Sequence, residues 1–279
     1  MHLGMKKPVA VFALISLSLL SVACSTGPTP PRKGTPEFYW QAAIETFGTA
    51  DYLKTADHLD SIGRTENQYT NKAQLWRLVL TSGMTKAFTE LADNYEFGAR
   101  INKANPTPFR KRVSNYRTMA AGLCLQFAET IRAFKQSHKE PEIALSFPFP
   151  TGSAGQVPGL NKLSNGIFLS DEEQEVTQKR MLERCILIAV ARSAGAGEDT
   201  AKAQAMFQAG EVKVPRATFM TAMANVLYEQ SQLFGVMKLD KPDQLKLFAT
   251  EALDTLKGVP ETKETKALTA KIQAALKRK

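Results

Sequence analysis

Apolar and polar positions alternate along most of the chain with the period of about 3.6 residues that marks one face of a helix. The same spacing predicts helices over 36–48, 52–62, 68–102, 108–136, 171–193, 201–207, 215–234 and 242–256, and a last helix around Leu268, Ile272 and Leu276. No run of alternating β-branched residues is long enough to predict a sheet. We therefore expect an all-α fold of antiparallel helix pairs.

Capping residues mark several helix ends. Thr35-Pro36 and Thr107-Pro108 each place a hydroxyl cap before a proline, which suits the first helical turn. Ser170 and Glu173 have the spacing of a capping box. Ser82-Gly83 is a candidate interruption of the helix over 68–102.

Residues 138–170 have a different pattern, in which four prolines and four glycines are mixed with large apolar residues. A connection of this length is usually functional or disordered. Its apolar content argues against disorder, because those side chains gain from burial. We expect the segment to lie over the helices, either as a lid or groove lining or as a purely structural connection.

The first residues have the layout of an export signal. Met5-Lys6-Lys7 is basic, Val9–Leu20 is apolar, and the apolar run to Ala23 is shorter than the roughly 20 residues that span a bilayer. Residues 1–23 are therefore predicted to be a signal peptide.

The end of this signal, Ser21-Val22-Ala23-Cys24, resembles the lipobox of bacterial lipoproteins, although Ser21 stands where an aliphatic residue is usual. The resemblance implies that Cys24 carries a diacylglyceride and a further acyl chain such as palmitate. Ser25 follows in place of Asp, which by the enteric sorting rule implies the outer membrane, with the domain on the periplasmic face.

The lipidated Cys24 would begin a tether over 24–34, a stretch rich in proline that has no large apolar side chain. Residues 35–279 then form one predicted helical domain. Removal of 1–23 takes away Lys6 and Lys7 and no acidic residue, so the formal charge falls from +9 to +7. This positive balance suits acidic partners or anionic headgroups, and export argues against nucleic acid.

The stretch from Tyr39 to Ile62 resembles a tetratricopeptide repeat, whose pattern sets an aromatic residue, two small residues, a turn and a second helix. The matching residues are Tyr39, Ala42, Ala43, Ala50-Asp51-Tyr52, Thr55, Leu59 and Ile62. A weaker match lies at Leu245, Ala249, Ala252 and Pro260. The resemblance implies an α-solenoid built of helix pairs, and an irregular helical bundle is the alternative.

Two cysteines, Cys124 and Cys185, remain after Cys24. Each lies in an apolar helical stretch, so they either form a disulfide or stay as buried thiols. Neither they nor His58 and His138 show metal-ligand spacing. We expect no metal, no cofactor and no catalytic residue, since no nucleophile with an oriented base is recognisable.

A cluster of basic residues surrounds the turn near 102–108 and is a candidate binding patch for an anionic partner; a solvated helix surface is the simpler interpretation. Its members are Arg100, Lys103, Arg110, Lys111, Arg112 and Arg117, and the acids of Asp93-Asn94-Tyr95-Glu96 are placed to pair with them. Trp40 and Trp76 could stack a ligand, but tryptophans in helical stripes more often belong to the core.

These features favour a noncatalytic lipoprotein of the cell envelope that acts as a scaffold for a protein or peptide partner. The alternative is a small-molecule or lipid-binding component of an envelope transport system, similar in plan to the helical lipoproteins associated with TRAP transporters. An enzyme ranks last.

Overall fold

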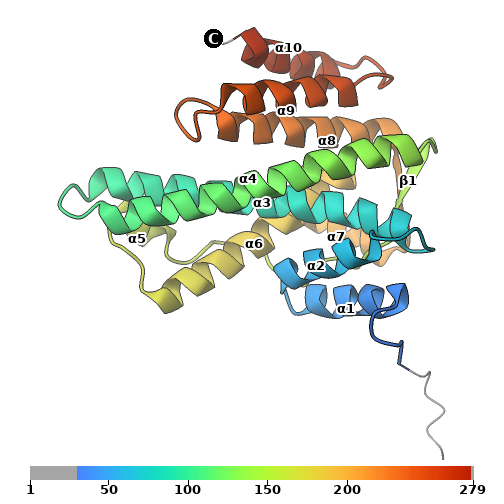
Figure 1. The fold of residues 1–279 in the computed structure, drawn as a ribbon, viewed down its shortest axis with the longest axis horizontal. Helices are drawn as coiled ribbons and strands as arrows, with labels where there is room; N and C mark the ends of the chain where they lie inside the picture. Colours follow the sequence, from blue (N-terminus) through green and yellow to red (C-terminus); the bar gives the residue numbers. More distant parts are fainter. Residues whose placement is uncertain (1–29, 278–279) are drawn as a thin grey trace, which may run out of the picture.

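The computed structural model describes residues 30–277 and confirms the all-α fold (Figure 1). Its ten α-helices are α1 Pro36–Gly48, α2 Tyr52–Ile62, α3 Thr70–Ile101, α4 Thr107–Ser137, α5 Leu160–Ser164, α6 Asp171–Ser193, α7 Thr200–Gln208, α8 Arg216–Ser231, α9 Pro242–Thr255 and α10 Lys263–Lys277. A 3₁₀ turn, η1, spans Gln232–Phe234, and two short strands are β1 Glu142–Leu145 and β2 Val212–Pro215.

Helices α3 and α4 form a long antiparallel hairpin at the centre of the molecule (Figure 1). Apolar residues at helical spacing bury the facing sides, with Phe88, Phe109 and Phe127 each fully inaccessible to solvent. Gly98 is required here, because a Cβ at that position would lie 2.6 Å from the Phe109 ring. The hairpin is the element against which the other layers pack.

Helix α6 packs along α3, and the contact corrects one sequence prediction. Ser82-Gly83 does not interrupt α3, which continues from Thr70 to Ile101. Gly83 lies where α6 crosses, and a Cβ there would be 2.7 Å from the Cα of Ile186. The glycine therefore allows a close approach of two helix backbones. The Ser170–Glu173 capping box that begins α6 is formed as predicted.

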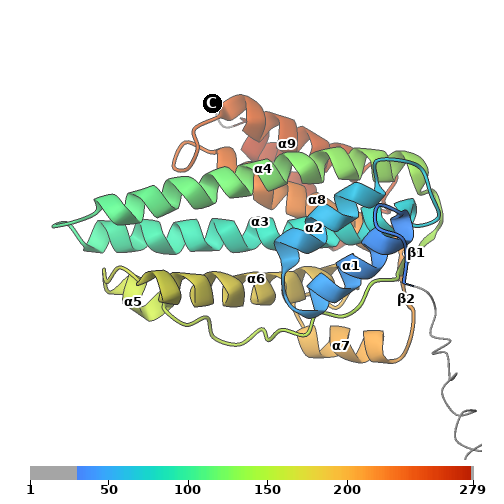
Figure 2. The ribbon, with the colours of Figure 1, turned by 60° about the horizontal axis from the view of Figure 1, so that its bottom comes forward.

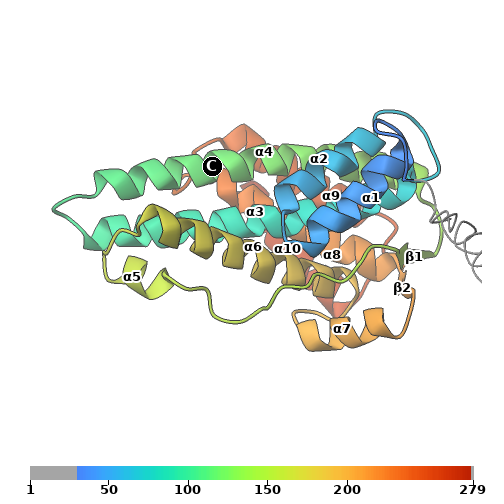
Figure 3. The same ribbon diagram turned by 90° about the horizontal axis from the view of Figure 1, so that it is seen from below.

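The segment 138–170 lies over the helices, where it runs past α6 and α7 (Figures 2 and 3). It buries Ile143, Leu145, Val157 and Leu163, and Phe147 stacks on Trp76 with ring centroids 5.8 Å apart. The expectation of no sheet is wrong, because β1 pairs antiparallel with β2. Four residues per strand and the distance between them along the chain hide this sheet from pattern analysis.

Helices α1 and α2 form an antiparallel pair at one end of the molecule (Figure 2). The facing sides are buried at Ala43 of α1 and at Thr55, Leu59 and Ile62 of α2. The hydroxyls of Thr46 and Thr55 lie 3.0 Å apart across the pair. The other described helices vary from 5 to 32 residues, so no pair of constant length repeats. Within residues 30–277 the arrangement is an all-α bundle or solenoid whose helices differ in length.

Helices α8, α9 and α10 stack as a third layer beside α4 (Figure 1). Phe134 of α4 packs on Phe219 of α8 at 5.4 Å, and Phe234 stacks on Phe248 of α9 at 5.1 Å. The first contact joins this layer to the hairpin, and the second lies within the layer.

Candidate functional site

The contact between α8–α10 and the helices α3, α4 and α6 is called the seam below. Cavities open along it between α4 and α9, between α6 and α10, between α3 and α4 near Lys238, and between α3 and α8. Ion pairs cross the same contact. Several partly open cavities with polar linings therefore lie along the seam.

One cavity of about 550 Å³ lies near the α3–α4 turn and is called the cationic pocket. Arg100 from α3, Arg110 and Arg117 from α4 and Lys238 from the loop before α9 line it, and Glu96 is its acidic residue. Arg110, Ser114 and Arg117 share one face of α4, because they are spaced by four and three residues. The helix periodicity thus directs these side chains toward one cavity.

The structure separates the six basic residues predicted as a patch. It brings Arg100, Arg110 and Arg117 together in the cationic pocket. Lys103 and Lys111 are exposed outside it, and Arg112 lies 3.5 Å from Asp171 at the start of α6. The patch is therefore half the predicted size.

Ion pairs hold part of the cationic pocket in place. The Glu96 carboxylate accepts from Arg117 at 2.8 Å and lies 3.4 Å from Arg100, as the sequence suggested. Arg117 is 9% exposed and also donates to the Lys238 carbonyl at 3.3 Å. Arg110 forms no ion pair with any residue in 30–277, so its charge is available to a partner.

Sequence reasoning missed Lys238, which joins Arg117 across 121 positions of the chain. Its ammonium group lies 2.8 Å from Asp93 of α3. Val236 and Met237, just before it, are 75% and 78% exposed. The sequence did carry one signal that could have pointed to Lys238. Two large apolar residues stand directly before a lysine in a loop predicted between two helices.

A second cationic cavity, of about 680 Å³, lies where α4, α8 and α9 meet. Lys135 bridges to Glu251 and Asp254 of α9 at 2.6 Å each, and Arg132 reaches Glu251 at 2.8 Å. Burial would lower the pKa of Lys135, but the two carboxylates outweigh it and the pKa is raised. Hydrogen bonding to Lys135 lowers the pKa of Asp254 to about 2.

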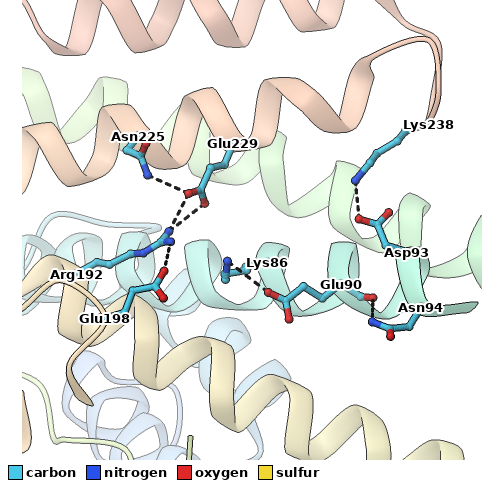
Figure 4. A network of polar contacts seen from close by, with 9 residues as sticks. All are labelled: Lys86, Glu90, Asp93, Asn94, Arg192, Glu198, Asn225, Glu229 and Lys238. Carbon is cyan, nitrogen blue, oxygen red and sulfur yellow. Dashed lines mark hydrogen bonds and ion pairs between the residues drawn. The ribbon is translucent and has the colours of Figure 1, made fainter. Parts of the chain in front are cut away.

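A polar network crosses the seam between α3, α6 and α8 (Figure 4). Arg192, at the end of α6, contacts both oxygens of Glu229 on α8 at 3.0 Å. Asn225 donates to Glu229 at 2.9 Å, and on α3 Lys86 lies 3.3 Å from Glu90. Most charges in this part of the seam are already paired within the protein.

The remaining candidate groups lie in the core. Cys124 and Cys185 are free and buried, so no disulfide joins them. Burial raises the pKa of Cys185 to about 12 and that of Cys124 further, which keeps both thiols protonated. Trp76 is fully buried, and Trp40 stacks on Tyr69 at 5.3 Å. These tryptophans serve packing.

Within residues 30–277, no three His, Cys, Asp or Glu side chains gather as metal ligands. No helix of that range combines the length and the apolar content needed to cross a bilayer. Cys24, the predicted lipidation site, lies outside the described residues, as does the whole signal sequence.

No protein-family model matches the chain, and no curated protein or solved structure is significantly similar to it.

Proposed function

We propose that this chain is a noncatalytic lipoprotein of the bacterial cell envelope, anchored through Cys24, that holds an acidic protein partner at the cationic pocket. The observation that carries the proposal is the gathering of Arg100, Arg110, Arg117 and Lys238 around one cavity. A carboxylate that enters this cavity gains charge-assisted hydrogen bonds, which are stronger than neutral ones.

A protein fits this surface better than a small anion. Val236 and Met237 are the most exposed large apolar residues within 30–277, and they adjoin Lys238. Interfaces between proteins combine an apolar centre, in which methionine and arginine are enriched, with a polar rim. An acidic segment with one or two apolar side chains matches both features.

The position of the pocket suits a tethered molecule. The described chain begins at Pro30 beside α1, and the α3–α4 turn lies at the opposite end (Figures 1 and 3). Helix α4 alone has 31 residues, or about 46 Å at 1.5 Å per residue. An anchor at Cys24 would leave the pocket facing away from the membrane, toward the periplasm.

The anchor is tested by fractionation. Cys24→Ala removes the acceptor of the lipid, so the protein should move from the outer-membrane fraction to the soluble periplasmic fraction. A Cys24→Ala protein that stays in the membrane fraction contradicts the lipoprotein assignment.

The pocket is tested by capture of envelope proteins on the purified chain. Arg110→Glu reverses a charge that is unpaired within 30–277 and should abolish capture of the partner. Lys111→Glu makes the same charge change one residue along α4, outside the pocket, and should leave capture intact. Equal capture by both variants would refute the proposed site.

A further inference from the structure

The second cationic cavity carries more positive charge than its own ion pairs neutralise. Its cationic side chains are Arg132, Lys135, Lys139, Arg216 and Lys257. Glu251 and Asp254 are its two carboxylates. Five cations against two carboxylates leave three positive charges in excess, and the cationic pocket of the proposed function lies elsewhere.

The two carboxylates are shared among three of the cations. Glu251 pairs with Arg132 and Lys135, and Asp254 lies 2.6 Å from Lys135 and 2.8 Å from Lys257. These contacts hold the Lys135 side chain, which is 18% exposed, at the wall of the cavity. An entering anion therefore finds part of its site already ordered, which lowers the entropic cost of binding.

Lys139 and Arg216 are the two remaining cations, and neither forms an ion pair with any residue in 30–277. The Lys139 ammonium donates to the Lys135 carbonyl at 2.6 Å. The charges of Arg216 and Glu140 influence each other, but the two groups form no ion pair. An arginine without an ion pair suits a phosphate group, because its planar fork of donors matches two phosphate oxygens at once.

The second cationic cavity lies toward the end of the molecule where the described chain begins. Its lining comes from the C-terminal ends of α4 and α9 and from the start of α8. In all three ribbon views the C-terminal end of α4 and the chain entering α1 lie at the same end of the long axis, opposite the α3–α4 turn (Figures 1, 2 and 3). An anchor at Cys24, as proposed above, would therefore hold this cavity on the membrane side.

We propose that this cavity binds the phosphate group of an anionic phospholipid in the membrane that anchors the chain, an inference that rests on the proposed anchor. The Arg216 guanidinium and the Lys139 ammonium bind the phosphate oxygens, and the paired cluster around Lys135 adds its excess positive charge. Anionic leaflets attract clusters of Lys and Arg that lie close to their surface. Headgroup binding here orients the domain, so that the cationic pocket at the other end points away from the membrane.

The test is native mass spectrometry of the full-length protein released from detergent after incubation with phosphatidylglycerol. The matched lipid is phosphatidylcholine with the same acyl chains, whose headgroup has no net charge. We expect phosphatidylglycerol adducts to be about tenfold more abundant than phosphatidylcholine adducts. Arg216→Glu should remove this difference. Lys111→Glu, which also replaces a cation by glutamate but lies near the other end of α4, should keep it.

A second variant guards against a folding defect. Lys139→Glu changes an exposed side chain and should also remove the difference between the lipids, while the thermal unfolding transition stays that of the wild type. Equal adducts of the two lipids on the wild type, or a difference that survives both Arg216→Glu and Lys139→Glu, would overturn the proposal.

A soluble probe separates the lipid from a free phosphate ester. Glycerol 3-phosphate carries a phosphate group without acyl chains and should form few adducts. Glycerol 3-phosphate adducts as abundant as those of phosphatidylglycerol, and lost in Arg216→Glu, would assign the cavity to a soluble ligand and overturn the lipid proposal. Arg216→Glu should leave partner capture at the cationic pocket intact, so this proposal and the proposed function fail separately.

Discussion

Helix α3 contacts α6 and α8 in two different ways. Against α6 the contact is close and apolar, with Gly83 directly below the backbone of Ile186. Against α8 the contact is looser, and a cavity there is lined by Lys86, Glu90 and Glu229 together with the apolar Val226. The same helix thus takes part in a packed interface and in the seam.

The difference between these two contacts shows where the molecule has space for a partner. A close-packed contact excludes any other atom, and changes of one methyl group are felt there. Ion pairs such as Arg192–Glu229 hold helices together at the reach of long side chains and leave cavities beside them. The cavities described above lie along the seam, and none lies at the Gly83 contact.

The largest expected effect is a loss of unfolding free energy at the close-packed contact between α3 and α6. Gly83→Ala places a Cβ 2.7 Å from the Ile186 Cα, so the helices must separate, at a cost of about 2 kcal/mol in unfolding free energy. Gly122→Ala on α4 is the matched control, because a Cβ there meets nothing within 4 Å. Higher helix propensity should make Gly122→Ala more stable by about 1 kcal/mol. Urea unfolding measures both, and equal effects would contradict the packing account.

A smaller effect is expected at the seam. Lys135→Met removes the bridge to Glu251 and Asp254, of which Glu251 is 11% exposed, and should cost about 1–2 kcal/mol. Lys54→Met removes the exposed pair with Asp51 and should leave the unfolding free energy unchanged. A loss for Lys135→Met as large as that for Gly83→Ala would show that the seam is packed as firmly as the core.

The smallest expected effect depends on pH. The pKa of Asp254 is lowered from 3.8 to about 2, so its contribution to stability is complete above pH 3.8 and is lost as the pH falls toward 2. Asp254 is 44% exposed, so solvent screening keeps this contribution below about 1 kcal/mol. Thermal unfolding of the wild type and of Asp254→Asn should differ at pH 6 and coincide near pH 2. A difference that persists at pH 2 would assign the effect to another group.

The sequence was sufficient for most features that depend on neighbours along the chain, although the predicted Thr107 cap is wrong, because α4 begins at Thr107 itself and no side chain caps it. Helix positions followed from apolar spacing, and the Ser170–Glu173 box followed from two residues three apart. The continuity of α3 through Gly83 did not follow, because only Ile186, on another helix, explains the glycine. Lys238 and the β1–β2 pairing escaped for the same reason, since their partners are distant in sequence.

The candidate site was predictable in part. Arg110 and Arg117 share a face by helix period alone, so their proximity could be read from the sequence. Lys111 and Arg112 follow Arg110 directly on α4, so they point to other faces of the helix, and Arg112 lies 3.5 Å from Asp171.

The most direct test of the central claim is photo-crosslinking in living cells from the cationic pocket. A photoreactive amino acid in place of Ser114, which is exposed at the pocket, should yield a discrete adduct with an acidic envelope protein. The same amino acid in place of Gln208 on α7 should yield none, and Arg110→Glu should abolish the Ser114 adduct. Identical adducts from both positions, or a Ser114 adduct that survives Arg110→Glu, would contradict a partner held at this pocket.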